Sequence, residues 1–303
     1  MVAWRKVVDA VHAAGSPIIP QLWHQGAMRL PGSKPNPDLP ALSPSGYYGD
    51  PETASEYYVE MARKLAVKGP VPSDAEIVEV VESFGRAAEQ AVAAGFDGLA
   101  LHGGHGYPLD QFLWEVTNLR DDRWGGNRKE RTAFAVAVIK RVRQAIGEDR
   151  PLIFRYSQWK QQDFLTRLAD TPQQLEEVLG PMADAGVDMF DASTRYFNTP
   201  AFAGSDMSLA GWAKKLTGKL TSAVGGVGFN KGMYDTWDPV TNTHKAGAEG
   251  FDNLDLVLRR FNAGEFDVIL IGRALLSDPA WIARAHRGEP FLPFDFRALD
   301  VLM

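Results

Sequence analysis

The chain has 303 residues, of which 45% are hydrophobic and 23% are charged, a globular composition that excludes wholesale disorder, a fibrous repeat and a coiled coil. With 32 basic against 38 acidic residues the net charge is −6, so no surface for nucleic acid or an anionic membrane is expected. The absence of cysteine excludes disulfides, iron–sulfur clusters and thiolate zinc sites. No apolar run predicts a transmembrane helix or a signal peptide, and a cytoplasmic protein is expected.

The N-terminal part of the sequence predicts a helix, a strand and a long loop. Apolar residues recur at helical spacing from Trp4 to Val11, and Gly15 provides a stop. A short buried strand is predicted over residues 18–23. Residues 31–72 hold eight of the nineteen prolines and are expected to form a long excursion loop, a type of segment that usually serves function.

A long helix is predicted from Ser73 to Gly95, because Ser73 can cap it and Glu76 can complete a capping box. Helices and strands then alternate. Strands are predicted at 98–102, 152–156, 189–193, 220–224 and 268–271, and helices near 128–146, 171–185, 209–216, 254–261 and 278–286. This alternation predicts right-handed βαβ units and a parallel sheet.

The element count favours an α/β fold of the TIM (β/α)8 barrel type. Six strands, each followed by a helix, and one initial helix without a strand fit a barrel with about six of its eight strands in this chain. The expected organisation is one barrel domain over residues 1–303, incomplete at its N-terminal end. A six-stranded open doubly wound sheet is the alternative, but its GxGxxG turn does not follow an early strand.

The densest polar cluster is the run from His102 to Tyr107, with the sequence HGGHGY, at the C-terminal end of a strand. In a barrel that end is the active-site face. The glycines allow a tight turn that brings His102, His105 and Tyr107 together, where two imidazoles can donate hydrogen bonds to an oxygen that gains negative charge and a phenol can deliver a proton. A turn with two satisfied histidines is the alternative. Two histidines at His-x-x-His spacing could also be metal ligands, with Asp110 as a third ligand, but a metal site is not predicted.

Two further polar residues lie within predicted strands. A guanidinium inside a strand, at Arg155, requires an anion or several acceptors, which an internal salt bridge with Asp191 or a bound cofactor would supply. Gln21 is expected to point inward and to bond either neighbouring backbone or a ligand. Three residues just past strand ends could wall a pocket or equally serve packing: Trp159, Lys160 and Tyr196.

Glycine-rich loops follow the last two predicted strands. Gly226 and Gly228 lie after the fifth strand, and Gly272 and Arg273 follow the sixth. If two strands are absent from the front, these are the loops after barrel strands 7 and 8, the usual phosphate site of the fold. Backbone N–H groups exposed by the glycines and the permanent charge of Arg273 would suit that anion.

Taken together these residues resemble the old yellow enzyme family of FMN-dependent ene-reductases, also called NADH:flavin oxidoreductases. The stretch GFDG at 95–98, the HGGHGY run, DQFL at 110–113, Thr117-Asn118 and Gly125-Gly126 is similar to the central signature of that family. QLWH at 21–24, Arg155, GGVG at 225–228 and GRALL at 272–276 match its other blocks in order. The resemblance covers essentially the whole chain.

The resemblance implies a barrel that holds FMN at its C-terminal mouth, reduced by NADH or NADPH, and a small-molecule substrate such as an electron-poor alkene of the enone type. His102 and His105 match residues that hold the carbonyl or nitro oxygen of the substrate, and Tyr107 matches the residue that protonates the substrate carbon opposite the hydride. Gln21 and Arg155 match contacts to the pyrimidine edge of the flavin. The matches to the phosphate site are Gly226, Gly228, Gly272 and Arg273.

The sequence departs from the family at its front end. Two initial strands of the family have no counterpart, and Pro108 stands where the family usually has an aliphatic residue. The first and last strands are therefore expected to be edges of an open sheet. We expect the protein as a result to be poorly soluble and to retain FMN poorly. A non-catalytic relative that does not hold FMN and a non-redox barrel enzyme for a phosphorylated substrate stay open. The 31–72 loop is expected to be a lid or a contact in a homo-oligomer.

Overall fold

A computed structural model describes residues 2–54, 59–65, 69–229, 237–238, 243–244 and 252–295. The chain forms two compact units. The first comprises Met1–Phe190 with Leu216–Lys219, and the second comprises Asp191–Lys215 with Leu220–Met303. Within the described ranges, no helix is both long and apolar enough to span a membrane.

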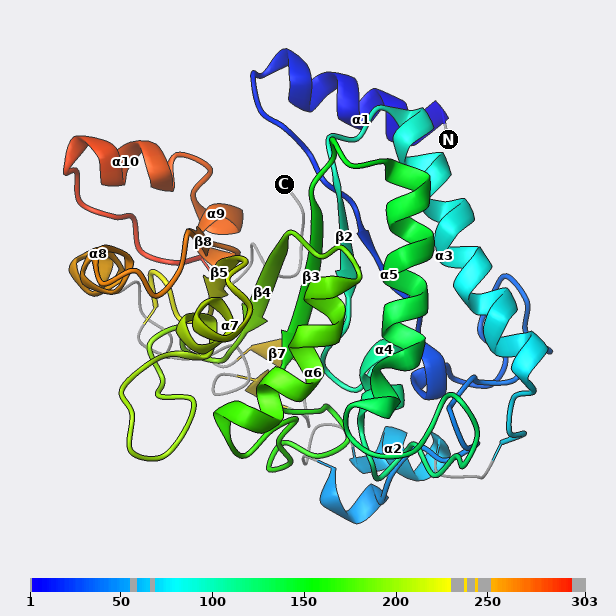
Figure 1. Cartoon of the computed structure of the whole chain (residues 1–303). Coiled ribbons are helices and arrows are strands. Elements are labelled where there is room, and N and C mark those ends of the chain that lie inside the picture. The colour runs from blue at the N-terminus through cyan, green and yellow to red at the C-terminus, as the bar shows by residue number, and fades with distance from the viewer. Residues whose placement is uncertain are drawn as a thin grey trace. The chain divides into compact units, whose positions relative to one another are not determined.

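The first unit alternates helices with strands (Figure 1). Its helices are α1 (Val2–Ala13), α2 (Val59–Leu65), α3 (Asp74–Ala94), α4 (Pro108–Leu113), α5 (Ala133–Ile146) and α6 (Pro172–Asp184), with 3-10 turns at Gly26–Met28, Pro51–Thr53 and Glu130–Thr132. Its strands are β1 (Gln21–Leu22), β2 (Leu99–His102) and β3 (Leu152–Ser157), and β4 (Met189–Ser193) begins here.

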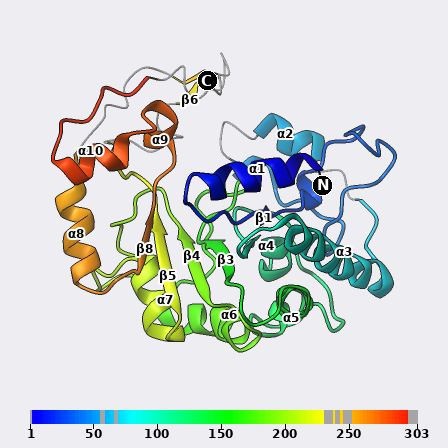
Figure 2. The same ribbon diagram turned by 90° about the horizontal axis from the view of Figure 1, so that it is seen from above.

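Parallel pairing brings the carboxyl ends of β1, β2 and β3 to one edge of the sheet. Figure 2 shows β1 and β3 from above. Gln21 of β1 pairs with Ala100 of β2, and His102 of β2 pairs with Arg155 of β3. Three polar residues that the sequence singles out, Gln21, His102 and Arg155, therefore stand at neighbouring strand ends.

Helix α3 begins with the predicted capping box, which the structure confirms. The Ser73 hydroxyl accepts a hydrogen bond from the Glu76 N–H, and the Glu76 carboxylate accepts one from the Ser73 N–H at 2.8 Å. The helix lies beside α5 (Figure 1), where Arg141 forms ion pairs with Glu82 at 2.8 Å and Glu89 at 2.7 Å. Its apolar face is buried as the periodicity predicts, at Ile77, Val81, Phe84 and Ala88.

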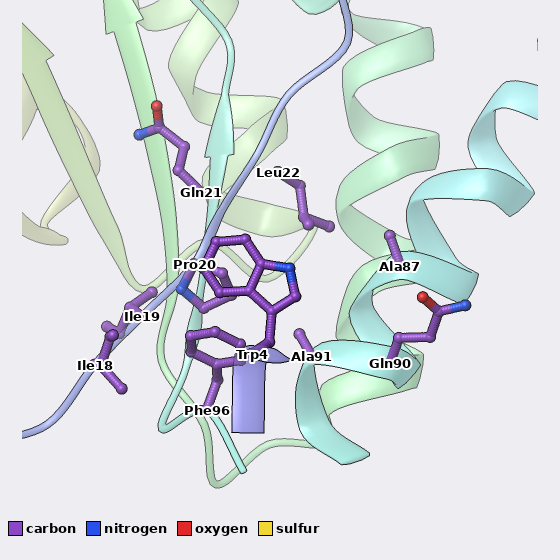
Figure 3. Close-up of a pocket in the computed structure, with 10 residues that line it drawn as sticks. All are labelled: Trp4, Ile18, Ile19, Pro20, Gln21, Leu22, Ala87, Gln90, Ala91 and Phe96. Atoms are coloured by element: carbon purple, nitrogen blue, oxygen red, sulfur yellow. The ribbon is translucent and has the colours of Figure 1, made fainter. Parts of the chain in front are cut away.

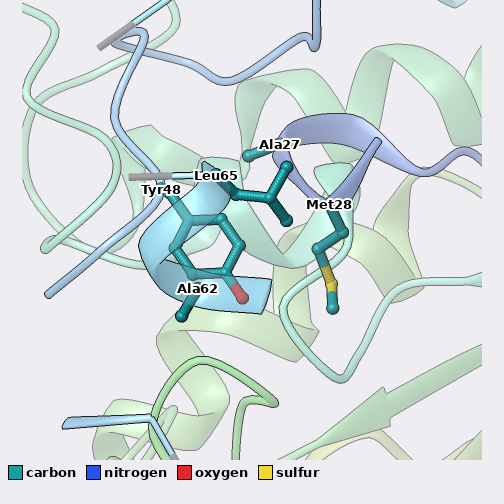
Figure 4. Packing of buried hydrophobic residues seen from close by; sticks show 5 residues of the cluster. All are labelled: Ala27, Met28, Tyr48, Ala62 and Leu65. Carbon is teal, nitrogen blue, oxygen red and sulfur yellow. The ribbon is translucent and has the colours of Figure 1, made fainter. Parts of the chain in front are cut away.

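The long excursion after β1 contains its own small core. The residues of this core are Ala27, Met28, Tyr48, Ala62 and Leu65 (Figure 4). Tyr107 packs against this cluster as a half-buried neighbour. The predicted loop at 31–72 thus includes the 3-10 turn Pro51–Thr53 and the helix α2, and its core is adjacent to the predicted site.

The second unit contains the remaining elements. Its helices are α7 (Leu209–Thr217), whose last two residues belong to the first unit, α8 (Leu254–Asn262), α9 (Arg273–Ser277) and α10 (Trp281–Arg287). Its strands are β5 (Leu220–Val224) and β8 (Val268–Leu270), with a short antiparallel pair of β6 (Trp237–Asp238) and β7 (Thr243–His244). β5 and β8 are parallel, with Ser222 opposite Val268.

The strand order β1-β2-β3-β4-β5-β8 gives the six-stranded parallel sheet that the sequence predicts. Within the described chain β1 pairs only with β2, and β8 pairs only with β5, so both are edges as expected. β1 is shorter than the predicted strand at 18–23 because Pro20 has no N–H to donate to the ladder. The carbonyls of Ile18 and Pro20 still accept hydrogen bonds from the N–H groups of Asp97 and Ala100.

Candidate functional site

The central feature of the first unit is the turn that follows β2. At His102 the strand ends, and the Gly103 N–H donates a hydrogen bond to the Arg155 carbonyl at 2.7 Å. Two residues later the backbone enters the left-handed region, with φ of +63° at His105 and +80° at Gly106. His105 is the one residue other than glycine with positive φ in the described part of the chain.

The turn brings the predicted histidines and tyrosine together. His102 Nδ1 lies 2.8 Å from Gln21 Oε1, and His105 Nδ1 lies 3.2 Å from His102 Nε2. The Tyr107 ring meets the His102 ring edge-on, with 5.1 Å between the ring centres. Four predicted site residues therefore form one contiguous cluster.

Aromatic and amide side chains surround this cluster. Trp23 meets the Tyr107 ring edge-on at 5.2 Å, and the Trp159 ring lies 4.5 Å from the His105 ring. Gln161 Nε2 donates a long hydrogen bond of 3.4 Å to the Tyr107 hydroxyl. Trp159, for which the sequence left a packing and a pocket role open, is thus a direct neighbour of His105.

Both histidines are neutral at physiological pH. Burial, reinforced by the positive charge of Arg155, lowers the pKa of His102 to about 4. Burial also holds the pKa of His105 well below the usual value, with smaller contributions from His102, Arg155 and Lys160. Each ring therefore carries one N–H and one acceptor nitrogen.

Gln21 does not point into a buried interior as the sequence predicts. Its residue is exposed, and its amide contacts His102. A cavity of about 370 Å³ is lined by residues of α1, β1 and α3, and Figure 3 shows the Gln21 amide directed away from the Trp4 ring. The cavity is lined by Trp4, Ile18, Ile19, Pro20, Gln21, Leu22, Ala87, Gln90, Ala91 and Phe96.

A buried ion pair contacts the turn that follows β2. Lys160 Nζ lies 2.6 Å from Asp110 Oδ1, with side chains 0% and 1% exposed. The other carboxylate oxygen of Asp110 accepts a hydrogen bond of 2.7 Å from the Gly106 N–H. Burial raises the pKa of Asp110, while the Lys160 ammonium and the Gly106 N–H oppose the shift. Sequence reasoning did not find this pair, although a lysine among Trp159 and Gln161 just past a strand end is a signal of it.

The second unit holds the predicted phosphate loop. Gly225, Gly226 and Gly228 all have positive φ, of 116°, 70° and 77°. A Cβ on Gly225 would lie 2.2 Å from the Thr194 carbonyl oxygen, so this part of the loop accepts only glycine. The side chain of Asn253 bridges the loop, because it accepts a bond of 3.0 Å from the Gly228 N–H and donates one of 2.8 Å to the Gly226 carbonyl.

Gly272 and Arg273 stand beside this loop. Gly272 caps α9, and the Arg273 guanidinium lies over the Phe229 ring at 4.5 Å from its centre. A Cβ on Gly228 would reach Ala274 of α9 within 3.4 Å, which shows how closely the loop and the helix approach. The second unit therefore brings the four predicted phosphate residues together, while the N–H of Gly228 is engaged by Asn253.

Comparison with known proteins identifies the family of the chain. The sequence profile of the NADH:flavin oxidoreductase / NADH oxidase family matches residues 1–291. The chain belongs to this family. FMN is the cofactor of the family, with NADH or NADPH as reductant, and the protein is an oxidoreductase.

The curated relatives include named reductases. Chanoclavine-I aldehyde reductase of Penicillium roqueforti is 31% identical over 299 residues, which are 97% of this chain and 70% of the relative. Rice 12-oxophytodienoate reductase 7 is 40% identical over 151 residues, 49% of this chain and 37% of that protein. The chain therefore covers less than two thirds of the length of some relatives that it matches, as for the rice reductase.

The solved structures show the fold. The old yellow enzyme homologue of Zymomonas mobilis superposes with a TM-score of 0.70 at 20% identity, over 98% of this chain and 74% of that chain. The predicted fold class, an α/β chain of the TIM-barrel type with six strands present, is therefore confirmed.

The residues of each unit fit FMN. Three glycines of the loop have positive φ, and a side chain at Gly225 would clash with the backbone. A loop of bare backbone can approach an anion closely, and Arg273 supplies a fixed positive charge beside it. In the first unit, Gln21 of β1 offers an amide and Arg155 of β3 a guanidinium on either side of β2, groups that suit the polar edge of a flavin.

Proposed function

We propose that the protein is an ene-reductase, which transfers hydride from NADH or NADPH through FMN to an alkene conjugated to a carbonyl group. The observation that carries this proposal is the cluster of two neutral histidines and a tyrosine at the turn after β2. The named relatives, an aldehyde reductase and 12-oxophytodienoate reductases, support a small carbonyl compound as substrate.

His102 and His105 bind the substrate carbonyl oxygen in this proposal. Hydrogen bonds to that oxygen withdraw electrons from the alkene and stabilise the negative charge that develops on oxygen during hydride addition. Neutral imidazoles suit this task, since they donate without the solvation cost of a buried cation.

The hydrogen-bond chain of the cluster responds to the substrate. With Gln21 Oε1 as acceptor, the proton of His102 lies on Nδ1, and His102 Nε2 accepts from His105 Nδ1. A carbonyl oxygen requires the opposite tautomers, with protons on the Nε2 atoms. Rotation of the Gln21 amide, which turns its NH2 group toward His102 Nδ1, reverses the chain: His102 Nε2–H then donates to His105 Nδ1, and His105 Nε2–H donates to the substrate oxygen. His102 joins it as a second donor when the substrate oxygen replaces His105 Nδ1 as the acceptor of its Nε2–H.

Tyr107 is the proton donor in the proposal. Its phenol is half-buried between His102 and Trp23, and Gln161 donates a hydrogen bond to its oxygen. That bond stabilises the phenolate that remains after proton transfer to the substrate carbon.

FMN, when bound, supplies the hydride. Gln21 and Arg155 are proposed to hold the pyrimidine edge of its ring, where the positive charge of Arg155 favours the reduced anion. Gly226, Gly228 and Gly272 are proposed to shape the phosphate site, with Arg273 as the charged partner.

The test is reduction of 2-cyclohexen-1-one by the FMN-loaded chain with NADH and with NADPH, without oxygen, compared with the variant His102→Ala/His105→Ala. We expect the double variant to bind FMN with unchanged affinity but to bind p-hydroxybenzaldehyde, a phenol that mimics an enolate, at least 100-fold more weakly. Removal of one donor to an oxyanion costs about 3 kcal/mol, a factor near 100.

Three outcomes distinguish the alternatives. Unchanged affinity of the double variant for the phenol contradicts the role of the histidines. A wild-type chain that never binds FMN favours a non-catalytic relative. A chain that binds FMN but reduces no enone contradicts the assigned substrate class.

A further inference from the structure

Both side chains of the ion pair Asp110–Lys160 are enclosed, at 1% and 0% exposure. Two buried charges lose their hydration, and their attraction offsets that loss only where further hydrogen bonds complete the geometry. Such a pair is a weak source of stability. The role of the pair therefore lies in the groups that it holds in place.

Both partners of the pair reach the turn at His105. Asp110 accepts the Gly106 N–H at 2.7 Å through the oxygen that does not face Lys160. The backbone of Lys160 forms a parallel bridge with His105, and the next N–H, of Gln161, donates to the His105 carbonyl at 3.2 Å. The side-chain pair thus ties the segment after β3 to the turn after β2.

The backbone of the turn needs such support. A φ of +63° places the Cβ of His105 close to backbone atoms, and a residue other than glycine keeps this conformation only where its surroundings fix it. The Ser157 hydroxyl accepts the His105 N–H at 2.8 Å. The Gly106 carbonyl accepts hydrogen bonds from the side chains of Gln111 at 2.6 Å and Gln162 at 2.8 Å.

We propose that Asp110 and Lys160 are positioning residues, which hold His105 and Tyr107 in the geometry needed to bind the substrate oxygen and to protonate the substrate. The proposal rests on the proposed ene-reductase function. The pair acts through Gly106 and the backbone of His105. Loss of the pair relaxes the left-handed turn, and the His105 ring leaves its place beside His102 and Trp159.

Three variants test the pair. Lys160→Met removes the ammonium at similar volume and leaves Asp110 without its charged partner. Asp110→Asn/Lys160→Gln replaces the ion pair by two amides that can still form one hydrogen bond, while the carbonyl oxygen of the introduced asparagine still accepts the Gly106 N–H. Lys214→Met is the matched control, because it removes a lysine from another ion pair, Lys214–Asp267 at 2.7 Å, in the second unit.

The first readout is the position of the His105 ring in solution. The Trp159 ring, 4.5 Å away, shifts the NMR signals of the imidazole C–H protons, which are assigned by comparison with His105→Gln. We expect Lys160→Met to lose this ring-current shift. The control and the double amide variant are expected to retain it.

The second readout is ligand binding and turnover of the FMN-loaded protein. For Lys160→Met we expect at least tenfold weaker binding of p-hydroxybenzaldehyde and at least tenfold lower kcat with 2-cyclohexen-1-one, while the Kd for FMN changes less than twofold. The double amide variant is expected to recover both quantities to within threefold of wild type. A role in stability alone would lower the thermal midpoint without this pattern.

An unchanged His105 shift in folded Lys160→Met overturns the inference, whatever the activity. If the wild type reduces no enone, the proposed function fails, and the NMR comparison still decides whether the pair positions His105. If Lys160→Met does not fold, Asp110→Ala/Lys160→Met decides, because it removes both charges together with the acceptor of the Gly106 N–H: a folded variant that keeps the His105 shift overturns the inference, and one that loses the shift supports it.

Discussion

His102 is held neutral by its surroundings, and this has a consequence for stability. In the unfolded chain a histidine has a pKa near 6.5, whereas burial and Arg155 lower the pKa of folded His102 to about 4. Between these values the unfolded state binds more protons than the folded state. The stability that neutral His102 contributes is complete above pH 6.5 and is lost as the pH falls toward 4.

We therefore expect the thermal midpoint of the wild type to fall between pH 6.5 and pH 4, and to fall less steeply in His102→Asn, which has no titrating ring. Asn keeps an amide that can bond Gln21. The measurement is thermal unfolding by circular dichroism at half-unit pH intervals. Parallel curves for the two proteins would show that His102 does not titrate differently in the folded state.

The sequence predicts part of the site because part of the site is local. His102, His105 and Tyr107 lie within a span of six residues, so their convergence follows from a glycine-rich turn at a strand end. The contact of Gln21 with His102 depends on the register of β1 against β2, which no local pattern encodes. The Asp110–Lys160 pair joins residues 50 positions apart, so only the three-dimensional structure reveals it.

Helix α3 shows how far the sequence predicts an element. Its cap, its buried face and its end follow from short-range patterns, and the structure confirms them. The sequence does not predict the helices α4 and α9, because they have only six and five residues and show no helical periodicity over such a length. Their positions depend on tertiary packing, as for Ala274 of α9 against Gly228.

The capping box of α3 gives a prediction for this element. Ser73→Ala removes the acceptor for the Glu76 N–H, and loss of an N-cap costs about 1 kcal/mol. For a unit of this size the thermal midpoint should fall by about 2–4 °C. Ser83→Ala in the middle of the same helix is the matched control, with no loss expected because alanine favours helix interiors.

A fall of the same size in both serine variants would mean that the hydroxyl of Ser73 contributes nothing as a cap. The comparison is made by differential scanning calorimetry at a pH where all acidic side chains are ionised, so that Glu76 keeps its charge in both proteins.

On the scale of the whole molecule, the predicted cofactor residues are divided between the two units. Gln21 and Arg155 belong to the first unit, and the glycine loop with Arg273 belongs to the second. A ligand that binds only the folded chain raises its stability by mass action, by about 2.7 kcal/mol at a hundredfold excess over Kd. Cofactor affinity is therefore readable as a thermal shift.

We expect FMN to raise the thermal midpoint more than riboflavin does, because only FMN carries the phosphate that Arg273 is proposed to bind. Arg273→Ala should reduce the FMN shift to that of riboflavin. Arg259→Ala, an exposed arginine on α8, is the matched control and should leave the difference intact. Equal losses with both flavins in Arg273→Ala would assign Arg273 a structural role over Phe229 instead.

The closed packing of the turn after β2 also limits how this chain can be redesigned. A Cβ on Gly103 would lie 2.1 Å from the Phe154 ring, and one on Gly106 would lie 1.7 Å from the Gln162 amide oxygen. A side chain at either glycine would therefore clash with these neighbours. New substrate preference must instead come from the residues that surround the turn. Trp23 is half exposed beside Tyr107, so a library of substitutions at this position would change the shape of the site and leave the backbone of the turn intact.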